Sequence, residues 1–148
     1  MKSIAVCSSA VHFKEVVEIG DRLRKLGFKV LLPQTADIMR KKGDYQVSHY
    51  KTWWSNPGDY SKKADLIRGH FRKITQADAI LVVNLEKKGM KGYIGGNTLM
   101  EMGLAFFLKK PIFIYRPISE ELVHKEEIYG LLPIFINGDL EKIKKYFH

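Results

Sequence analysis

Five short apolar runs, each of strand length, are spread along the chain with more polar stretches between them. They are residues 3–7 (SIAVC), 29–33 (KVLLP), 79–84 (AILVVN), 111–116 (PIFIYR) and 133–137 (PIFIN). Uninterrupted apolar strands are typical of parallel sheets, where helices bury both faces. The sequence therefore predicts an α/β fold, a five-stranded parallel sheet with helices on both faces, of the flavodoxin-like or Rossmann-like kind.

Between these runs, apolar residues recur at helical spacing. Residues 11–26 carry such a pattern, and Gly27 ends it, which gives one βαβ unit. Further helices are expected at 97–109, 119–130 and about 139–146. Because ligands of such sheets bind beyond the carboxyl ends of the strands, we expect the site near residues 7–9, 84 onward and 115–117.

The length of 148 residues predicts a single domain, residues 1–148. Residues 39–63 interrupt the alternation, because they mix polar and aromatic side chains without a clear period. Long loops in compact domains usually serve as lids or interfaces. We expect a lid or interface insertion here, and a homodimer with residues 45–60 at or near the contact. A small satellite core beneath the loop is the alternative.

The formal net charge of +9 would attract a phosphorylated ligand. The lysine pairs are short and scattered, so nucleic acid is not an expected partner. Cys7 is the one cysteine, which excludes a disulfide framework and a cysteine-rich zinc site and favours a reducing, cytoplasmic location. The longest apolar runs are far below the roughly 18 residues of a membrane span, and the amino terminus does not resemble a signal peptide. We expect neither a metal nor another cofactor.

Glu101 is an unexpected residue in the stretch YIGGNTLMEMG, residues 93–103, because its neighbours are apolar on nearly every side of the expected helix. A buried carboxylate is costly unless it is paired or used. One interpretation places it inside the helix, facing a cleft. The other is a capping box, since Thr98 and Glu101 have its three-residue spacing. Spacing alone leaves both open.

The start of that helix predicts an anion site. Gly95 and Gly96 lead into its first turn, where free backbone amides attract anions and glycine permits close approach. Asn97 or Thr98 is the expected N-cap.

Residues 76–84 and 93–117, QADAILVVN and YIGGNTLMEMGLAFFLKKPIFIYRP, resemble the segment shared by nucleoside 2-deoxyribosyltransferases and deoxynucleoside 5′-monophosphate N-glycosidases. Those enzymes carry a nucleophilic glutamate in a Glu-x-Gly setting, followed by a basic residue and proline. The matching residues here are Glu101 to Gly103 and Lys110-Pro111. The early VCSS also resembles the first-strand loop that holds sugar or phosphate in those families. A fainter likeness is to phosphoribohydrolases that release cytokinin bases, with Asn97 in place of their third motif glycine.

Three features depart from the family pattern. His70 stands where those families place an aspartate, and a histidine can also donate a proton near neutral pH. Gly95 replaces an acidic or hydroxyl residue and offers no side chain. The 39–63 segment is foreign to the pattern. Asp78, which the families place at the strand start, is expected to be structural.

The resemblance implies cleavage or transfer at the N-glycosidic bond of a nucleoside or nucleoside 5′-monophosphate. In this interpretation Glu101 is the nucleophile and His70 the acid that helps the base leave. The implied substrate-binding residues are Ser8, Ser9, Gly95, Gly96, Asn97 and Thr98. The alternative is a non-catalytic nucleotide-binding module on the same fold, which the changes at His70 and Gly95 favour.

Overall fold

The computed structural model describes all residues, 1–148. Its centre is a five-stranded sheet in the order β2-β1-β3-β4-β5, and every neighbouring pair is parallel. The strands are β1 Ser3–Ser8, β2 Lys29–Leu31, β3 Ala79–Val83, β4 Ile112–Ile114 and β5 Ile134–Phe135. The predicted five-stranded parallel α/β fold is confirmed, and the strand order is the flavodoxin-like one.

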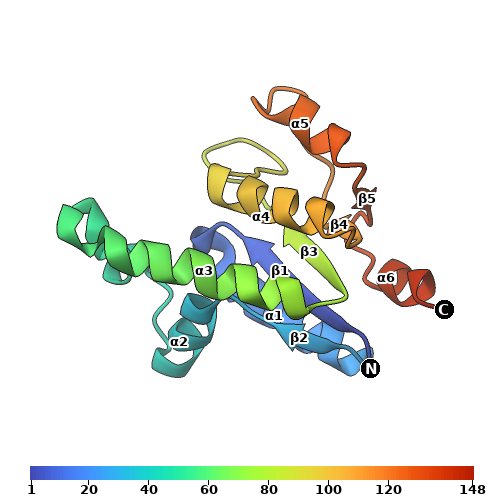
Figure 1. Cartoon of the computed structure of the whole chain (residues 1–148), viewed down its shortest axis with the longest axis horizontal. Helices are drawn as coiled ribbons and strands as arrows, with labels where there is room; N and C mark the ends of the chain where they lie inside the picture. Colours follow the sequence, from blue (N-terminus) through green and yellow to red (C-terminus); the bar gives the residue numbers. More distant parts are fainter.

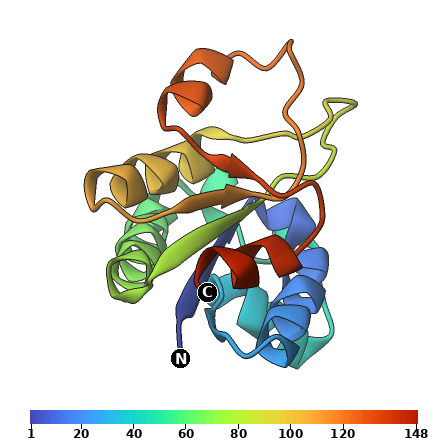
Figure 2. The same cartoon turned by 90° about the vertical axis from the view of Figure 1, so that its right-hand side faces the viewer.

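Helices cover both faces of this sheet (Figures 1 and 2). They are α1 Phe13–Lys25, α2 Gln34–Lys42, α3 Tyr60–Gln76, α4 Gly96–Phe107, α5 Lys125–Gly130 and α6 Glu141–Tyr146. Alternate residues of β1 point to opposite faces. Ile4 and Val6 pack in the core beneath α1, α2 and α6, whereas Ala5 and Cys7 pack in the core beneath α3, α4 and α5. None of the helices is both long and apolar enough to cross a membrane.

Two expected helices are shorter than the sequence pattern suggested. The helix predicted over 119–130 spans only Lys125–Gly130. The Ser119 hydroxyl accepts a hydrogen bond from the Glu121 amide at 3.2 Å, and such local bonds compete with helix formation. The helix predicted over 11–26 begins at Phe13, after a 3₁₀ turn at Ala10–His12.

The predicted 39–63 insertion is partly helical. Its first residues finish α2 and its last residues begin α3, and the apolar spacing of the sequence predicted neither helix. Gly43, at φ 64°, ends α2 in the left-handed conformation that suits glycine. The irregular part is therefore 43–59, which contains 3₁₀ turns at Val47–His49, Thr52–Trp54 and Pro57–Asp59. Figure 1 shows it leading into the far end of α3.

The aromatic side chains of this segment have different environments. Trp53 is buried, and Tyr45 and Tyr50 pack against the core under α1 and α2, as the satellite-core alternative expected. Trp54 is 61% exposed.

We expect the protein to be a dimer in solution, with residues 45–60 at or near the contact, because large exposed aromatics are enriched at interfaces. Light scattering at micromolar concentration measures this directly. Trp54→Ser should shift the equilibrium toward the monomer. A monomeric wild-type protein under these conditions would contradict the prediction.

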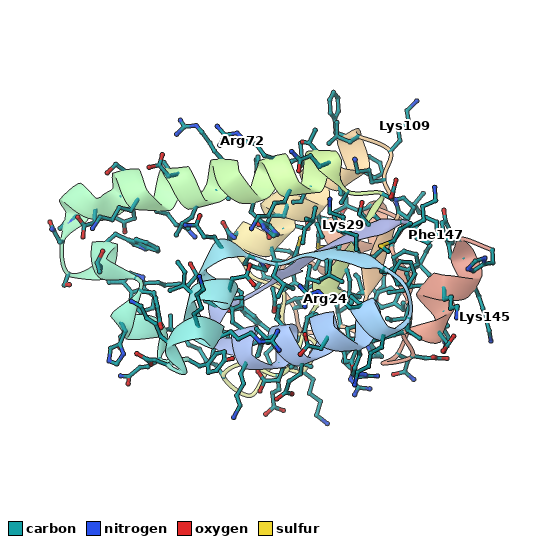
Figure 3. The ribbon with its side chains drawn as sticks, turned by 90° about the horizontal axis from the view of Figure 1, so that it is seen from below. Arg24, Lys29, Arg72, Lys109, Lys145 and Phe147 are labelled. Atoms are coloured by element: carbon teal, nitrogen blue, oxygen red, sulfur yellow. The ribbon has the colours of Figure 1, made fainter.

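Basic side chains are carried by several elements, among them α1, β2, α3 and α6. Figure 3 labels Arg24, Lys29, Arg72, Lys109 and Lys145 on well-separated parts of the ribbon. The lysines that contribute to the candidate site lie elsewhere, around a cavity.

Candidate active site

A cavity of about 250 Å³ lies where β1 ends and α4 begins. Ser8 and Ser9 approach it from the end of β1, and His70 approaches from the middle of α3. Glu101 and the first turn of α4 form another wall. The structure thus brings together all the site residues expected from the sequence, which are Ser8, Ser9, His70, Gly95, Gly96, Asn97, Thr98 and Glu101.

Glu101 and His70 face each other across the cavity wall. Glu101 Oε2 lies 3.8 Å from His70 Nε2, and both side chains are at least 93% buried. Cys7 Sγ lies 3.6 Å from the same His70 nitrogen. Cys7 reaches this point because it alternates toward the sheet face that α3 and α4 cover. Helices α3 and α4 and strand β1 therefore hold three reactive side chains together.

Burial controls the ionisation of this pair. It raises the pKa of Glu101 to about 8, although the Cys7 thiol and the Lys63 ammonium oppose the shift. Burial also lowers the pKa of His70 to about 4, and Lys73 adds to this shift. At pH 7 the Glu101 carboxyl is therefore mostly protonated and the His70 imidazole is neutral. The expectation that His70 itself begins as a proton donor needs correction, because its resting form carries no acidic imidazolium.

The start of α4 differs from the predicted capping pattern. The helix begins at Gly96 with Gly95 as N-cap, and no side chain caps it. The expected N-cap at Asn97 or Thr98 is therefore wrong, and no capping box forms. Glu101 lies in the second turn, where its carboxyl faces His70. The structure thus favours the cleft-facing interpretation over the capping one.

The first turn of α4 offers backbone donors to the cavity. The first backbone bond that closes a helical turn runs from the Leu99 amide to the Gly95 carbonyl, at 3.0 Å. The amides of residues 96–98 precede it and have no acceptor within the helix. A Cβ at Gly95 would lie 3.3 Å from the Tyr93 ring, so glycine lets that ring pack closely.

The two serines have different hydrogen-bond partners. The Ser8 hydroxyl donates to the Val83 carbonyl at 2.6 Å, which ties β1 to β3, and its oxygen can still accept a hydrogen bond. The Ser9 hydroxyl accepts a hydrogen bond from Lys87 Nζ at 3.0 Å.

Three lysines that the sequence analysis did not select line the same cavity: Lys51, Lys63 and Lys87. Burial lowers the pKa of all three lysines. The charges of Lys63 and Lys87 lower the pKa of Lys51 further, because the three ammonium groups lie close together. Each ammonium lies over an aromatic ring, with Lys51 on Trp54 at 5.0 Å, Lys63 on Trp53 at 5.6 Å and Lys87 on Tyr93 at 5.0 Å. Such a cluster of donors is suited to an anion.

No protein-family model and no curated protein matches this chain. Its fold is similar to that of a 2-deoxyribosyltransferase. That solved structure, from the psychrotolerant bacterium Bacillus psychrosaccharolyticus, is 19% identical in sequence, with a TM-score of 0.61. The match covers 95% of this chain and 89% of that one. At this identity the similarity establishes a shared fold.

Asp78 and Lys110, which belong to the motifs of the family resemblance, lie outside the cavity and make structural contacts. Asp78 Oδ2 accepts a hydrogen bond from the Ser3 amide at 2.8 Å and holds the start of β1. Lys110 Nζ donates to the Thr75 carbonyl at 2.7 Å, near the end of α3. Asp78 thus has the structural environment that was expected for it.

Proposed function

We propose that this protein cleaves the N-glycosidic bond of a nucleoside or nucleoside 5′-monophosphate and releases or exchanges the base. The observation that carries the proposal is Glu101, a buried carboxyl in a cavity wall that faces His70 and forms no ion pair with a lysine or arginine. Perturbed carboxyls in cavities at the carboxyl ends of parallel strands are typical of catalytic groups. The fold shared with a 2-deoxyribosyltransferase supports this reaction class.

In the proposed reaction, Glu101 acts as a carboxylate on the anomeric carbon. The new C–O bond forms as the C–N bond breaks, and the bonding electron pair leaves with the base. Water then releases the sugar, or a second base takes it. This scheme resembles the two-step chemistry of retaining glycosidases, in which a covalent intermediate is formed and then resolved.

His70 first accepts the proton of Glu101 in this scheme. The present separation of 3.8 Å exceeds a hydrogen bond, and catalytic contacts often shorten once substrate is bound. The pKa of His70 is about 4 and that of Glu101 about 8, so this transfer is uphill in the resting site and proceeds only as the Glu101 oxygen bonds to the anomeric carbon. It leaves an imidazolium beside the reacting carboxylate. That imidazolium then protonates the departing base. His70 therefore starts neutral and becomes the acid only during the reaction.

Lys51, Lys63 and Lys87 favour a 5′-phosphate on the substrate. Together with the free amides of residues 96–98, they supply positive charge around the cavity. Glu101 does not cancel this charge, because its carboxyl is mostly neutral at pH 7. A nucleoside 5′-monophosphate would complement these donors better than a neutral nucleoside.

Lys63→Gln is expected to lower kcat/KM for a monophosphate by about 10- to 100-fold, the usual effect of one hydrogen bond to a charged group. The matching nucleoside should lose little, because it has no phosphate to bind. Paired kinetic assays on the two substrates measure the difference, with exposed Lys142→Gln as the control variant. An equal loss for both substrates would show that Lys63 does not bind phosphate.

The pH dependence of base release tests the role of Glu101. Because the proton that Glu101 gives to His70 is the one that the departing base takes, the reactive pair carries one proton. With a Glu101 pKa of about 8, kcat/KM should therefore be level near neutral pH and fall above about pH 8, where Glu101 loses that proton to solvent. His70, with a pKa of about 4, should add no step between about pH 5 and 9. A profile that stays flat from about pH 7 to 9 would contradict the proposal, since a carboxyl with a pKa of about 8 loses its proton there.

A further inference from the structure

We propose that Cys7, His70 and Glu101 form a binding site for a Zn²⁺ ion. Each residue offers one donor atom, and the three donor atoms lie within 4.8 Å of one another. Thiolate, imidazole and carboxylate are the ligands that zinc prefers. The binding itself does not depend on the proposed function.

The spacing of the donor atoms fits tetrahedral coordination. Zinc bonds of about 2.3 Å to sulfur and about 2.1 Å to nitrogen or oxygen place S and N about 3.6 Å apart and N and O about 3.4 Å apart. The observed separations are 3.6 Å from Cys7 Sγ to His70 Nε2, and 3.8 Å from His70 Nε2 to Glu101 Oε2. The third pair, Cys7 Sγ and the Glu101 carboxyl, is at most 4.8 Å apart, so this carboxyl moves toward the sulfur when the site closes around an ion.

Charge and access also suit a divalent cation. Binding releases one proton from the Cys7 thiol and one from the Glu101 carboxyl, and the resulting two negative charges balance Zn²⁺ in a buried environment. His70 and Glu101 line the cavity, which gives the ion a route in and leaves a fourth position for water. Three protein ligands plus one open position is the usual form of a reactive zinc site.

Zinc and the proposed reaction compete for the same atom. An ion bound by Glu101 removes the carboxylate from the anomeric carbon. Under the proposed function, Zn²⁺ should therefore inhibit base release, and a chelator should restore it. This consequence rests on the proposed function, so the binding test below uses no substrate.

Cobalt titration of the chelator-treated protein tests the site, because Co²⁺ replaces Zn²⁺ and reports its ligands by absorption. Cys7 is the one cysteine in the chain, so a thiolate-to-cobalt charge-transfer band can come only from it. We expect this band to saturate at one ion per chain and to disappear when Zn²⁺ is added.

Matched variants separate this site from surface binding. Cys7→Ser should abolish the band, and His70→Gln should weaken binding by more than about 100-fold, since even outer-shell partners contribute 10- to 100-fold. His148→Gln, at the exposed end of the chain, should change nothing. Circular dichroism checks folding, and Cys7→Ala serves in place of the serine variant if that one does not fold. Absence of the charge-transfer band in wild type at saturating Co²⁺ would overturn the proposal, as would unchanged binding in His70→Gln.

Discussion

Glu101→Gln is expected to lower the rate of base release by about 10³-fold or more while substrate still binds. Glutamine fits the same buried space, but its amide is a poor nucleophile and cannot become a carboxylate. Single-turnover rates and calorimetric binding constants separate the two effects. The residual rate of the variant should show no step near pH 8, because the titrating nucleophile is gone.

Exposed Glu126→Gln, on α5, is the control for this substitution and should retain wild-type rates. Thermal unfolding of both variants provides the structural comparison. A Glu101→Gln protein that is destabilised yet keeps its specific activity would assign Glu101 a structural role and contradict the nucleophile proposal.

His70→Ala is expected to reduce base release by about 10²- to 10⁴-fold, the range typical of acid–base catalysis. The loss should be larger for bases that leave with difficulty, because these depend most on the proton that His70 delivers. Rates on a series of substrates with different leaving bases measure this trend. Equal losses on all of them would show that His70 positions Glu101 or the ligand and does not transfer a proton.

The sheet could be predicted because its strands are continuous apolar runs whose identity depends on local sequence alone. The central strands β1 and β3 match the predicted ranges closely, whereas β5 is reduced to Ile134–Phe135 at the edge of the sheet. Helix α2 was missed because only its Ala36 and Met39 are buried, and its last turn consists of basic residues. Weak amphipathic patterns of this kind leave a helix hard to distinguish from a polar loop.

The residues of the candidate site were also only partly predictable from the sequence. Glu101 could be selected because a carboxyl among apolar neighbours is conspicuous in one short segment. Cys7 could not, because it meets His70 across 63 positions of sequence, and only the alternation of β1 turns it toward α3. Lys51 and Lys87 lie in separate loops that meet only at the cavity.

The pKa values depended on the structure in the same way. The sequence contained two opposing influences on Glu101, apolar neighbours and the amides at the helix start. Packing decides between them, since Glu101 is 4% exposed and its pKa is raised. The expected acid role of His70 changed for the same reason, because burial favours the neutral imidazole.

The most direct test of the proposed reaction is to incubate the wild-type protein with a panel of nucleosides and their 5′-monophosphates and to follow free base by chromatography. The proposal predicts base release from at least one of them, faster from monophosphates than from the matching nucleosides, and absent with Glu101→Gln. Tight binding of a nucleotide with no base released from any member of the panel would contradict it and identify the protein as a nucleotide-binding module.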